Sequence, residues 1–224
     1  MRRFASILLL AAAAALPAGA ENTTIVRTET RNLPSNGVSS LSLDVAVGEI
    51  EVSADDSSDV RVEIRFACST HRLASCMETA KRARVDTGRS GDRLDVNVRK
   101  FPKWKNAGLH VKAHVIAPRR LGVKVDLGVG EVHVEGFEGN VDVDLGVGEA
   151  HVQAPESAVR SVSVDTGIGE SHLIAAGRHF SSEGLFTRTI DWDEGTGRSR
   201  VSVDCGVGEA HVRLDRGEAA AAKR

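Results

Sequence analysis

Residues 201–212 read VSVDCGVGEAHV, and this stretch decides the fold because the chain repeats it. Residues 123–134 (VKVDLGVGEVHV), 141–152 (VDVDLGVGEAHV) and 162–173 (VSVDTGIGESHL) are close copies. The copy at 41–52, LSLDVAVGEIEV, has Ala in place of the first Gly and Glu in place of the His. Internal repetition this close is typical of architectures in which similar units stack on one another.

The motif itself indicates a bent strand. Val201, Val203 and Cys205 share one face because side chains of a strand alternate. Cys205 and Ala210 are an odd number of residues apart, yet both belong to the apolar set. A continuous strand cannot turn both inward, so residues 206–208, Gly-Val-Gly, are predicted to form a bulge or corner. A mostly apolar position also makes Cys205 a buried structural thiol.

The spacing of the motif copies suggests that the same unit recurs along the whole chain. A looser copy is read at residues 83–96, ARVDTGRSGDRLDV, and the motif Asp residues then recur at intervals close to multiples of about twenty. Residues 60–66, 109–116 and 188–192 would be unmarked coils. The pattern predicts an all-β chain folded as a β-solenoid with coils of about twenty residues, each stacked on the last. The alternative makes each Gly-Val-Gly a hairpin turn in an antiparallel sandwich.

The two ends of the chain are set apart from this domain. Residues 1–20 have a basic start, an apolar run and a small-residue cleavage site, which predicts a secretory signal peptide. We expect one β-solenoid domain over residues 21–214 and a disordered tail over 215–224. No later stretch is long and apolar enough to predict a transmembrane span. The predicted location is therefore the periplasm or the cell surface.

Charge excludes one class of partner. Without residues 1–20, the chain has 27 Lys and Arg against 31 Asp and Glu, a formal charge near −4. A general nucleic-acid binder would show a basic surplus, so no nucleic-acid partner is expected.

Cys68 and Cys76 lie close together in a chain predicted to be exported, which favours a disulfide bond between them. Between residues 69 and 83 we expect a short helix that Thr70 caps and this disulfide pins. Leu73, Cys76, Met77 and Ala80 would form its apolar face.

A basic and aromatic loop follows at residues 99–106. Four cations there surround Phe101 and Trp104, and the segment could contact an anionic envelope polymer or a lipid surface. The alternative is a solvated loop whose Trp packs back onto a strand. The candidate partner-binding residues are Lys100, Phe101, Lys103, Trp104 and Lys105.

Stacked copies would also align their polar side chains. We expect rows of carboxylates and imidazoles about 4.8 Å apart, in which like charges repel. A divalent cation could offset this repulsion. Alternatively each Asp accepts hydrogen bonds from the backbone of its own turn, while His and Glu pair across coils. Asp126, Asp144 and Asp165 form the first row, and Glu209 and His211 extend the others. The candidate metal ligands are His133, His151, His172, Glu131, Glu149 and Glu170.

With a leader and rungs of the form Val-x-Val-Asp-x-Gly-x-Gly-Glu-x-x-Val, residues 38–214 resemble the putative-adhesin, or toast-rack, family of bacterial envelope proteins. This resemblance implies a right-handed, β-helix-like stack of strands and no enzymatic activity. The His in four copies and the Cys68–Cys76 insert depart from the family pattern.

The sequence carries no catalytic motif: there is no nucleophile elbow, zinc-protease helix or phosphate loop. We therefore expect an exported, non-enzymatic β-solenoid that acts as an adhesin-like interaction or scaffold module for an envelope protein or polysaccharide. It would need no cofactor. The alternative is a periplasmic metal-binding protein that uses the Asp, Glu and His rows. A carbohydrate-processing β-helix enzyme is disfavoured because the carboxylates repeat rather than form one unique pair.

Overall fold

The computed structural model describes residues 23–99, 108–184 and 188–216. The protein is all-β, as predicted, with twelve strands in one mixed sheet and one α-helix within that part of the chain. The sheet order is β1-β3-β6-β2-β7-β8-β12-β9-β10, with β5 and β11 pairing beside β2 and β9.

Each clear copy of the motif lies in one long strand, and we call these five the motif strands. They are β2 (Ser40–Asp55), β7 (Gly122–Glu135), β8 (Val141–Pro155), β9 (Val159–Ala175) and β12 (Ser199–Asp215). Neighbouring motif strands pair in parallel and in register, so Asp126 lies opposite Asp144 and His133 lies opposite His151. Since the two halves of a motif strand pair with other strands and not with each other, the hairpin alternative is wrong.

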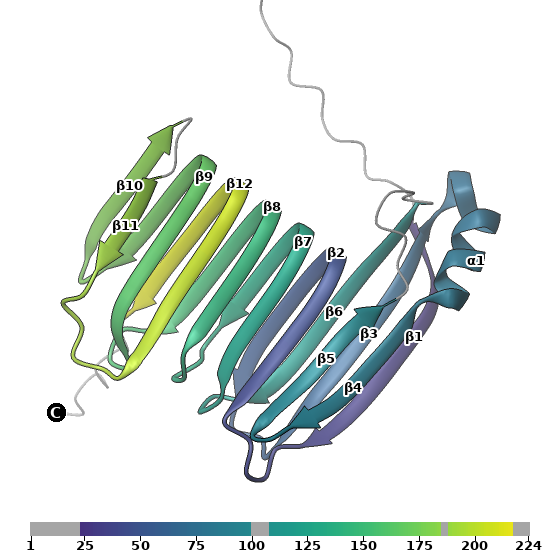
Figure 1. Ribbon diagram of the computed structural model, residues 1–224, viewed down its shortest axis with the longest axis horizontal. Coiled ribbons are helices and arrows are strands. Elements are labelled where there is room, and N and C mark those ends of the chain that lie inside the picture. The colour runs from purple at the N-terminus through teal and green to yellow at the C-terminus, as the bar shows by residue number, and fades with distance from the viewer. Residues whose placement is uncertain (1–22, 100–107, 185–187, 217–224) are drawn as a thin grey trace, which may run out of the picture.

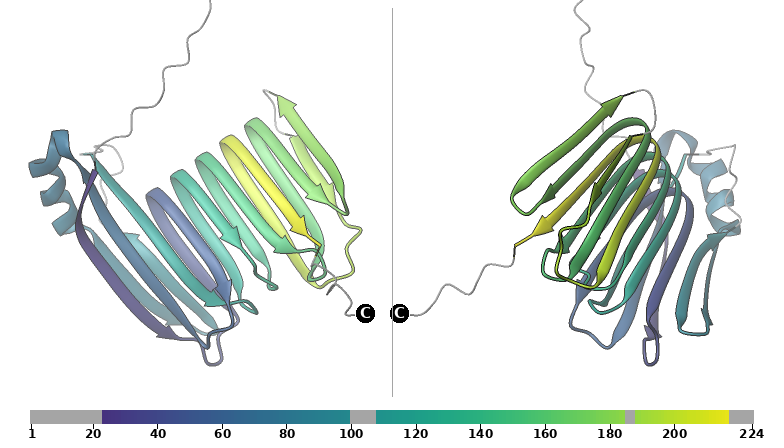
Figure 2. Two further views of the ribbon diagram at one scale, coloured as in Figure 1. Left: turned by 180° about the vertical axis from the view of Figure 1, so that it is seen from behind. Right: turned by 60° about the vertical axis from the view of Figure 1, so that its left-hand side comes forward.

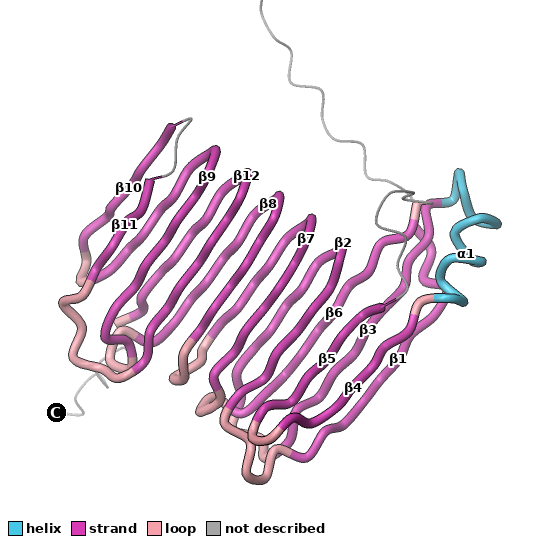
Figure 3. The backbone as a smooth tube through the Cα atoms, in the orientation of Figure 1, coloured by secondary structure: helices cyan, strands magenta, loops and turns pink. Residues whose placement is uncertain are grey.

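The Gly-Val-Gly segment bends the strand as predicted. Each motif strand folds back on itself, so its two halves lie in two facing layers (Figures 1 and 3). Cys205, before the bend, and Ala210, after it, are both buried in the core between the layers. Gly208 has a φ of 140°, a conformation that side chains with a Cβ rarely adopt.

The second glycine of the bend is also required by close stacking. A Cβ added to Gly148 would lie 1.8 Å from the carbonyl oxygen of Gly130 in the next strand. The first glycine position is tight as well, since a Cβ on Gly128 would lie 2.4 Å from the oxygen of Ala46. Ala46 itself is tolerated at that position in β2, the last motif strand on that side of the stack.

The order of the motif strands differs from the prediction. β12 lies between β8 and β9 and pairs in parallel with both (Figure 1). The expectation that each coil stacks on the last is therefore wrong. The copies share nearly the same pattern of buried side chains, so each can pair in register with any other, and chain order alone does not select the neighbour.

Antiparallel strands close both ends of the stack, as Figure 2 shows from two further sides. β10 (Arg178–Gly184) and β11 (Arg188–Trp192) pair with the two halves of β9. At the other end, β5 (Arg93–Arg99) and β6 (Leu109–Pro118) pair in parallel with the two halves of β2 and together replace one motif strand. β3 (Asp59–Ser69) then pairs antiparallel with β6, and β1 (Thr23–Pro34) with β3.

These ends correct the prediction of evenly spaced coils. The looser copy at 83–96 is an antiparallel hairpin of β4 (Arg84–Ser90) and β5, joined by a turn that contains Gly91. Asn97, not Asp86, lies opposite the motif Asp44. Of the three segments proposed as unmarked coils, only β6 runs parallel to a motif strand, because β3 and β11 are antiparallel to their neighbours.

The helix insert is confirmed, although its details differ. A 3₁₀ turn, η1 (Thr70–Arg72), precedes α1 (Leu73–Arg82), and no side chain caps the start of either one, so Thr70 is not a cap. In α1 only Cys76 and Ala80 are buried, so half of the expected apolar face is exposed. The disulfide between Cys68 and Cys76 is present and joins α1 to the end of β3.

Candidate functional site

In-register pairing turns each position of the motif into a row of side chains across the stack. In spatial order, the Asp row is Asp44, Asp126, Asp144, Asp204 and Asp165, and the Glu row is Glu49, Glu131, Glu149, Glu209 and Glu170. The His row is His133, His151, His211 and His172, with Glu51 in the corresponding place on β2. The bend row is Val47, Val129, Val147, Val207 and Ile168.

The imidazoles of the His row form one continuous stack. The ring centroids of His133 and His151 are 4.8 Å apart, those of His151 and His211 are 4.9 Å apart, and those of His211 and His172 are 4.8 Å apart. His179 of β10 stacks on His172 at 5.7 Å. The sequence predicted these rows, but His151 and His172 are not neighbours because the strand that carries His211 lies between them.

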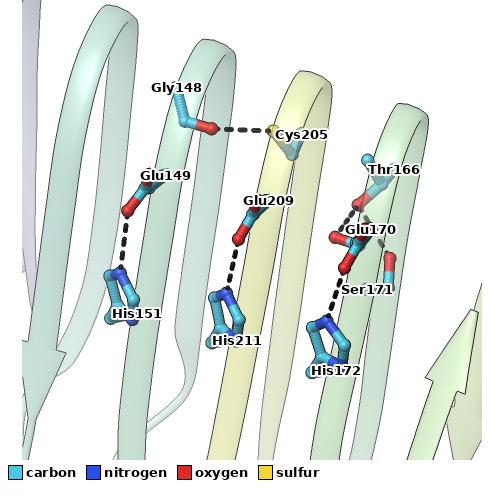
Figure 4. A network of polar contacts seen from close by, with 10 residues as sticks. All are labelled: Gly148, Glu149, His151, Thr166, Glu170, Ser171, His172, Cys205, Glu209 and His211. Carbon is cyan, nitrogen blue, oxygen red and sulfur yellow. Dashed lines mark hydrogen bonds and ion pairs between the residues drawn. The ribbon is translucent and has the colours of Figure 1, made fainter. Parts of the chain in front are cut away.

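Each His of the row pairs with the Glu two residues before it on its own strand, as Figure 4 shows for three of the four pairs. This geometry follows from alternation, since residues two apart project from the same face of a strand. The expectation that His and Glu pair across strands is wrong. The distances from Nε2 to a carboxylate oxygen are 2.6 Å for His133–Glu131, 3.5 Å for His151–Glu149, 3.1 Å for His211–Glu209 and 3.2 Å for His172–Glu170.

One part of this surface gathers enough ligand atoms for a metal ion. Glu131, His133 and His151 each offer one ligand atom, and these atoms lie within 4.8 Å of one another. Two imidazole nitrogens and a carboxylate oxygen are a donor set that suits zinc and similar transition metals. The predicted ligands Glu170 and His172 are separated from this group by β12.

Electrostatics differ along the Asp row. Lys124 lies 3.4 Å from Asp126 and 3.7 Å from Asp142, and these carboxylates raise the pKa of Lys124 against the opposing effect of burial. Burial and the neighbouring carboxylates of Asp165 and Asp144 raise the pKa of Asp204. Carboxylates of the Asp row therefore do repel one another around Asp204, whereas the positive charge of Lys124 offsets this repulsion near Asp126.

The bend row is a functional candidate that sequence reasoning missed. Four of its aliphatic side chains remain 43–48% exposed: Val129, Val147, Val207 and Ile168. Beside β2, β7 and β8, an open groove of about 430 Å³ on one side of it is lined by Asp44, Asp126 and Asp144. Another of about 500 Å³ on the other side is lined by Glu49, Glu131 and Glu149 together with Lys112 and His110. The signal was available, because the residue between the two motif glycines is aliphatic in every copy.

Two core positions of the motif carry polar substitutions. Cys205 is buried as predicted, its Sγ lies 3.8 Å from the carbonyl oxygen of Gly148, and burial raises the pKa of its thiol. In β9 the corresponding position is Thr166, whose Oγ1 accepts a 2.7 Å hydrogen bond from Ser171 (Figure 4). These two hydroxyls satisfy each other where the other strands are apolar.

Five residues predicted to bind a partner lie outside the described part of the chain: Lys100, Phe101, Lys103, Trp104 and Lys105. The residues that flank them are described. Arg99, at the end of β5, lies 3.9 Å from Asp86, and the carbonyl oxygen of Gly108 accepts a 2.8 Å hydrogen bond from the backbone of Ser69. Residues 1–20 and most of the predicted tail also fall outside it. Within the described ranges, no helix is long and apolar enough to cross a membrane.

Comparison with solved structures finds matches at low identity. A putative cell adhesion protein from Clostridium sporogenes ATCC 15579 is 15% identical over 84% of this chain and 99% of that chain, with a TM-score of 0.49. A putative adhesin from Bacteroides fragilis NCTC 9343 is 12% identical over 84% and 97%, with a TM-score of 0.34. One from Parabacteroides merdae ATCC 43184 is 10% identical over 58% and 59%, with a TM-score of 0.30.

No family model matches the chain, and no curated protein matches it.

Proposed function

We propose that the protein is an exported, non-enzymatic, adhesin-like module that binds another protein of the cell envelope through the bend row. The observation that carries this proposal is the row of four aliphatic side chains exposed along one edge of the stack. Contiguous exposed apolar side chains with a polar rim are typical of interaction sites. In this proposal the stack is wound as a right-handed solenoid over one domain, as the family resemblance implies.

The chemistry around the bend row favours a protein partner over an anionic polysaccharide. Over β2, β7 and β8, grooves with carboxylates lie on both sides of the row, with Asp126 and Asp144 in one and Glu131 and Glu149 in the other. Lys112 also lines the second groove, where its charge is paired with Glu49. A partner that fits this edge presents apolar side chains flanked by Lys or Arg. An anionic polymer would instead be repelled here.

Two observations support export, and with it a place in the periplasm or on the cell surface. The Cys68–Cys76 disulfide is of a kind that persists in oxidising compartments, and the first twenty residues have the composition of a signal peptide. The loop at 99–106 remains a second candidate contact. Its cations would serve an anionic surface, so the two contacts take partners of different chemistry.

The test is retention of the protein by the envelope of the producing cell. A triple variant, Val129→Ser, Val147→Ser and Val207→Ser, removes most of the bend row without touching the core. We expect it to shift from the envelope fraction to the soluble fraction, whereas the control Ile25→Ser, at a side chain 57% exposed outside the motif strands, stays with the envelope.

A photo-crosslinking residue at position 147 should join the wild-type protein to one envelope protein, and free competitor without a label should suppress the product. Equal retention of the triple variant and the wild type, with no specific product, would refute the proposal.

A further inference from the structure

We infer that the His row binds two divalent transition-metal ions, one at His133/His151 and one at His211/His172. The inference is independent of the bend row, because it concerns the second half of the motif strands rather than the bend. It starts from the group Glu131, His133 and His151, whose ligand atoms lie within 4.8 Å of one another. Zinc held by such donors at 2.0–2.2 Å in a tetrahedron separates its ligand atoms by about 3.4 Å.

The side chains can close the remaining gap. His133 and His151 retain 42% and 37% of their side-chain exposure, and Glu131 retains 47%. Their outer atoms therefore face solvent, and side-chain rotation can move them by the difference of about 1.4 Å or less that separates 4.8 Å from this coordination distance. The Nε2 atom of each His already points at a carboxylate, so an ion placed between them meets nitrogen and oxygen ligands together.

Charge and space around the group also favour a cation. The place that a His would occupy on β2 is taken by Glu51, which lies opposite His133 and adds a carboxylate beside the first site. An open groove of about 260 Å³ runs along the His row and gives an ion access from solvent. Arg213, on the wall of this groove, is paired with Asp215 at 3.0 Å, which offsets its charge.

The position of β12 determines the number of sites. Because His211 lies between His151 and His172, the four imidazoles divide into the pairs His133/His151 and His211/His172. Each pair has two carboxylates of the Glu row, and among the described residues the first pair alone already gathers three ligand atoms within 4.8 Å. A third ion between His151 and His211 would share both of its imidazoles with its neighbours and lie about 5 Å from each of them, where like charges repel. Two ions per chain is the expected stoichiometry.

The proposal is tested by titrating the purified exported protein with Zn²⁺ by calorimetry, and with Co²⁺ by visible absorption, which reports tetrahedral coordination. We expect two ions per wild-type chain. The double variant His133→Ala/His151→Ala should keep one ion, and so should the single variant His211→Ala, which removes one imidazole of the second pair. His71→Ala, at an exposed His on η1, is the matched control and should keep both.

A conservative variant separates coordination from packing. Glu131→Gln keeps the size of the side chain but removes its charge, and we expect it to weaken the first site at least about tenfold while the second is unchanged. Circular dichroism of every variant should match the wild type, since the substituted side chains are partly exposed.

Three results would overturn the inference: no Zn²⁺ binding at 100 μM or below, a stoichiometry that His133→Ala/His151→Ala leaves at two, or an equal loss of binding in His71→Ala. Because none of these variants alters the bend row, failure here leaves envelope retention unaffected, and failure of retention leaves metal binding unaffected.

Discussion

The motif strands and the N-terminal region beside them differ in which charged side chains lie next to one another on the surface. In the N-terminal region, formed by β1, β3–β6 and α1, opposite charges meet: Arg31 lies 2.7 Å from Glu29, and Arg93 lies 2.7 Å from Asp95. In the stack, identical positions meet, so Asp204 lies between Asp144 and Asp165. In-register repetition builds the core from one pattern, but it also aligns the carboxylates of the Asp row and of the Glu row with their like.

The two regions also use glycine differently. In the stack, glycines are needed because neighbouring backbones nearly touch at the bend, whereas Gly88 in the β4–β5 hairpin has open space around the position of a Cβ. The stack therefore does not tolerate a side chain at the glycines of the bend. The N-terminal region tolerates one at Gly88 and is stabilised instead by a disulfide.

The largest expected effect comes from substituting a glycine at the bend, compared with a glycine of the β4–β5 hairpin. Gly148→Ala places a Cβ 1.8 Å from the carbonyl oxygen of Gly130 and requires a φ of 141°, so we expect a loss of about 3 kcal/mol or more in the free energy of unfolding. Gly88→Ala, with nothing within 4 Å, should change it by less than about 0.5 kcal/mol. Urea denaturation measures both, and equal losses would contradict the contrast.

The next effect concerns the disulfide of the N-terminal region. Cys68→Ala/Cys76→Ala should lower the free energy of unfolding by about 2 kcal/mol. Without the disulfide the unfolded chain has more conformational entropy, and α1 is no longer joined covalently to β3. Hydrogen exchange should show faster exchange in β1, β3 and α1 and unchanged protection in β7, β8 and β12. Loss of protection in both regions at once would show that they unfold as a single unit.

A smaller effect is expected from the polar pair in the core of β9. Thr166→Leu gives this strand the residue that β8 has as Leu145, but it leaves the buried hydroxyl of Ser171 without its partner, at a cost of about 1–2 kcal/mol. Adding Ser171→Ala, which matches Ala150, should recover that loss. Thermal melting of the single and double variants measures the coupling, and additive losses would mean that the hydroxyls do not act as a pair.

The smallest effect comes from the Asp row. Its raised pKa means that Asp204 binds a proton more readily in the folded state, so its contribution to stability falls as pH rises through the folded pKa. Asp204→Asn should therefore raise the melting temperature at pH 7. The gain should be worth no more than about 1 kcal/mol, because the side chain is only partly shielded from solvent, and it should vanish in acid and in high salt.

The control is Asp126→Asn, which removes an attraction to Lys124 and should not stabilise the protein. Stabilisation by both substitutions would mean that the whole row is repulsive.

The features that depend on side-chain alternation and on strand register could be predicted from the sequence. The odd spacing between the apolar residues Cys205 and Ala210 predicted the bend. Repetition of the motif predicted the rows that bring Glu131, His133 and His151 together. The neighbours of β12 could not be predicted, because the motif strands have the same register and similar core residues. The hairpin of β4 and β5 was mistaken for a copy because Val-Asp-Thr-Gly matches the motif letters, although its later residues turn the chain back. The exposed bend row was not predicted, because aliphatic residues in a strand ordinarily indicate burial.

The place of β12 has a consequence for how the stack is completed. Residues 199–215 follow the other motif strands along the chain, yet they fill a gap in the middle of the stack between β8 and β9. Until β12 is in place, β8 and β9 each keep a long unpaired edge of nearly identical sequence, and such edges invite pairing with other chains. A chain cut before residue 199 would therefore be more prone to aggregate than a merely shorter stack.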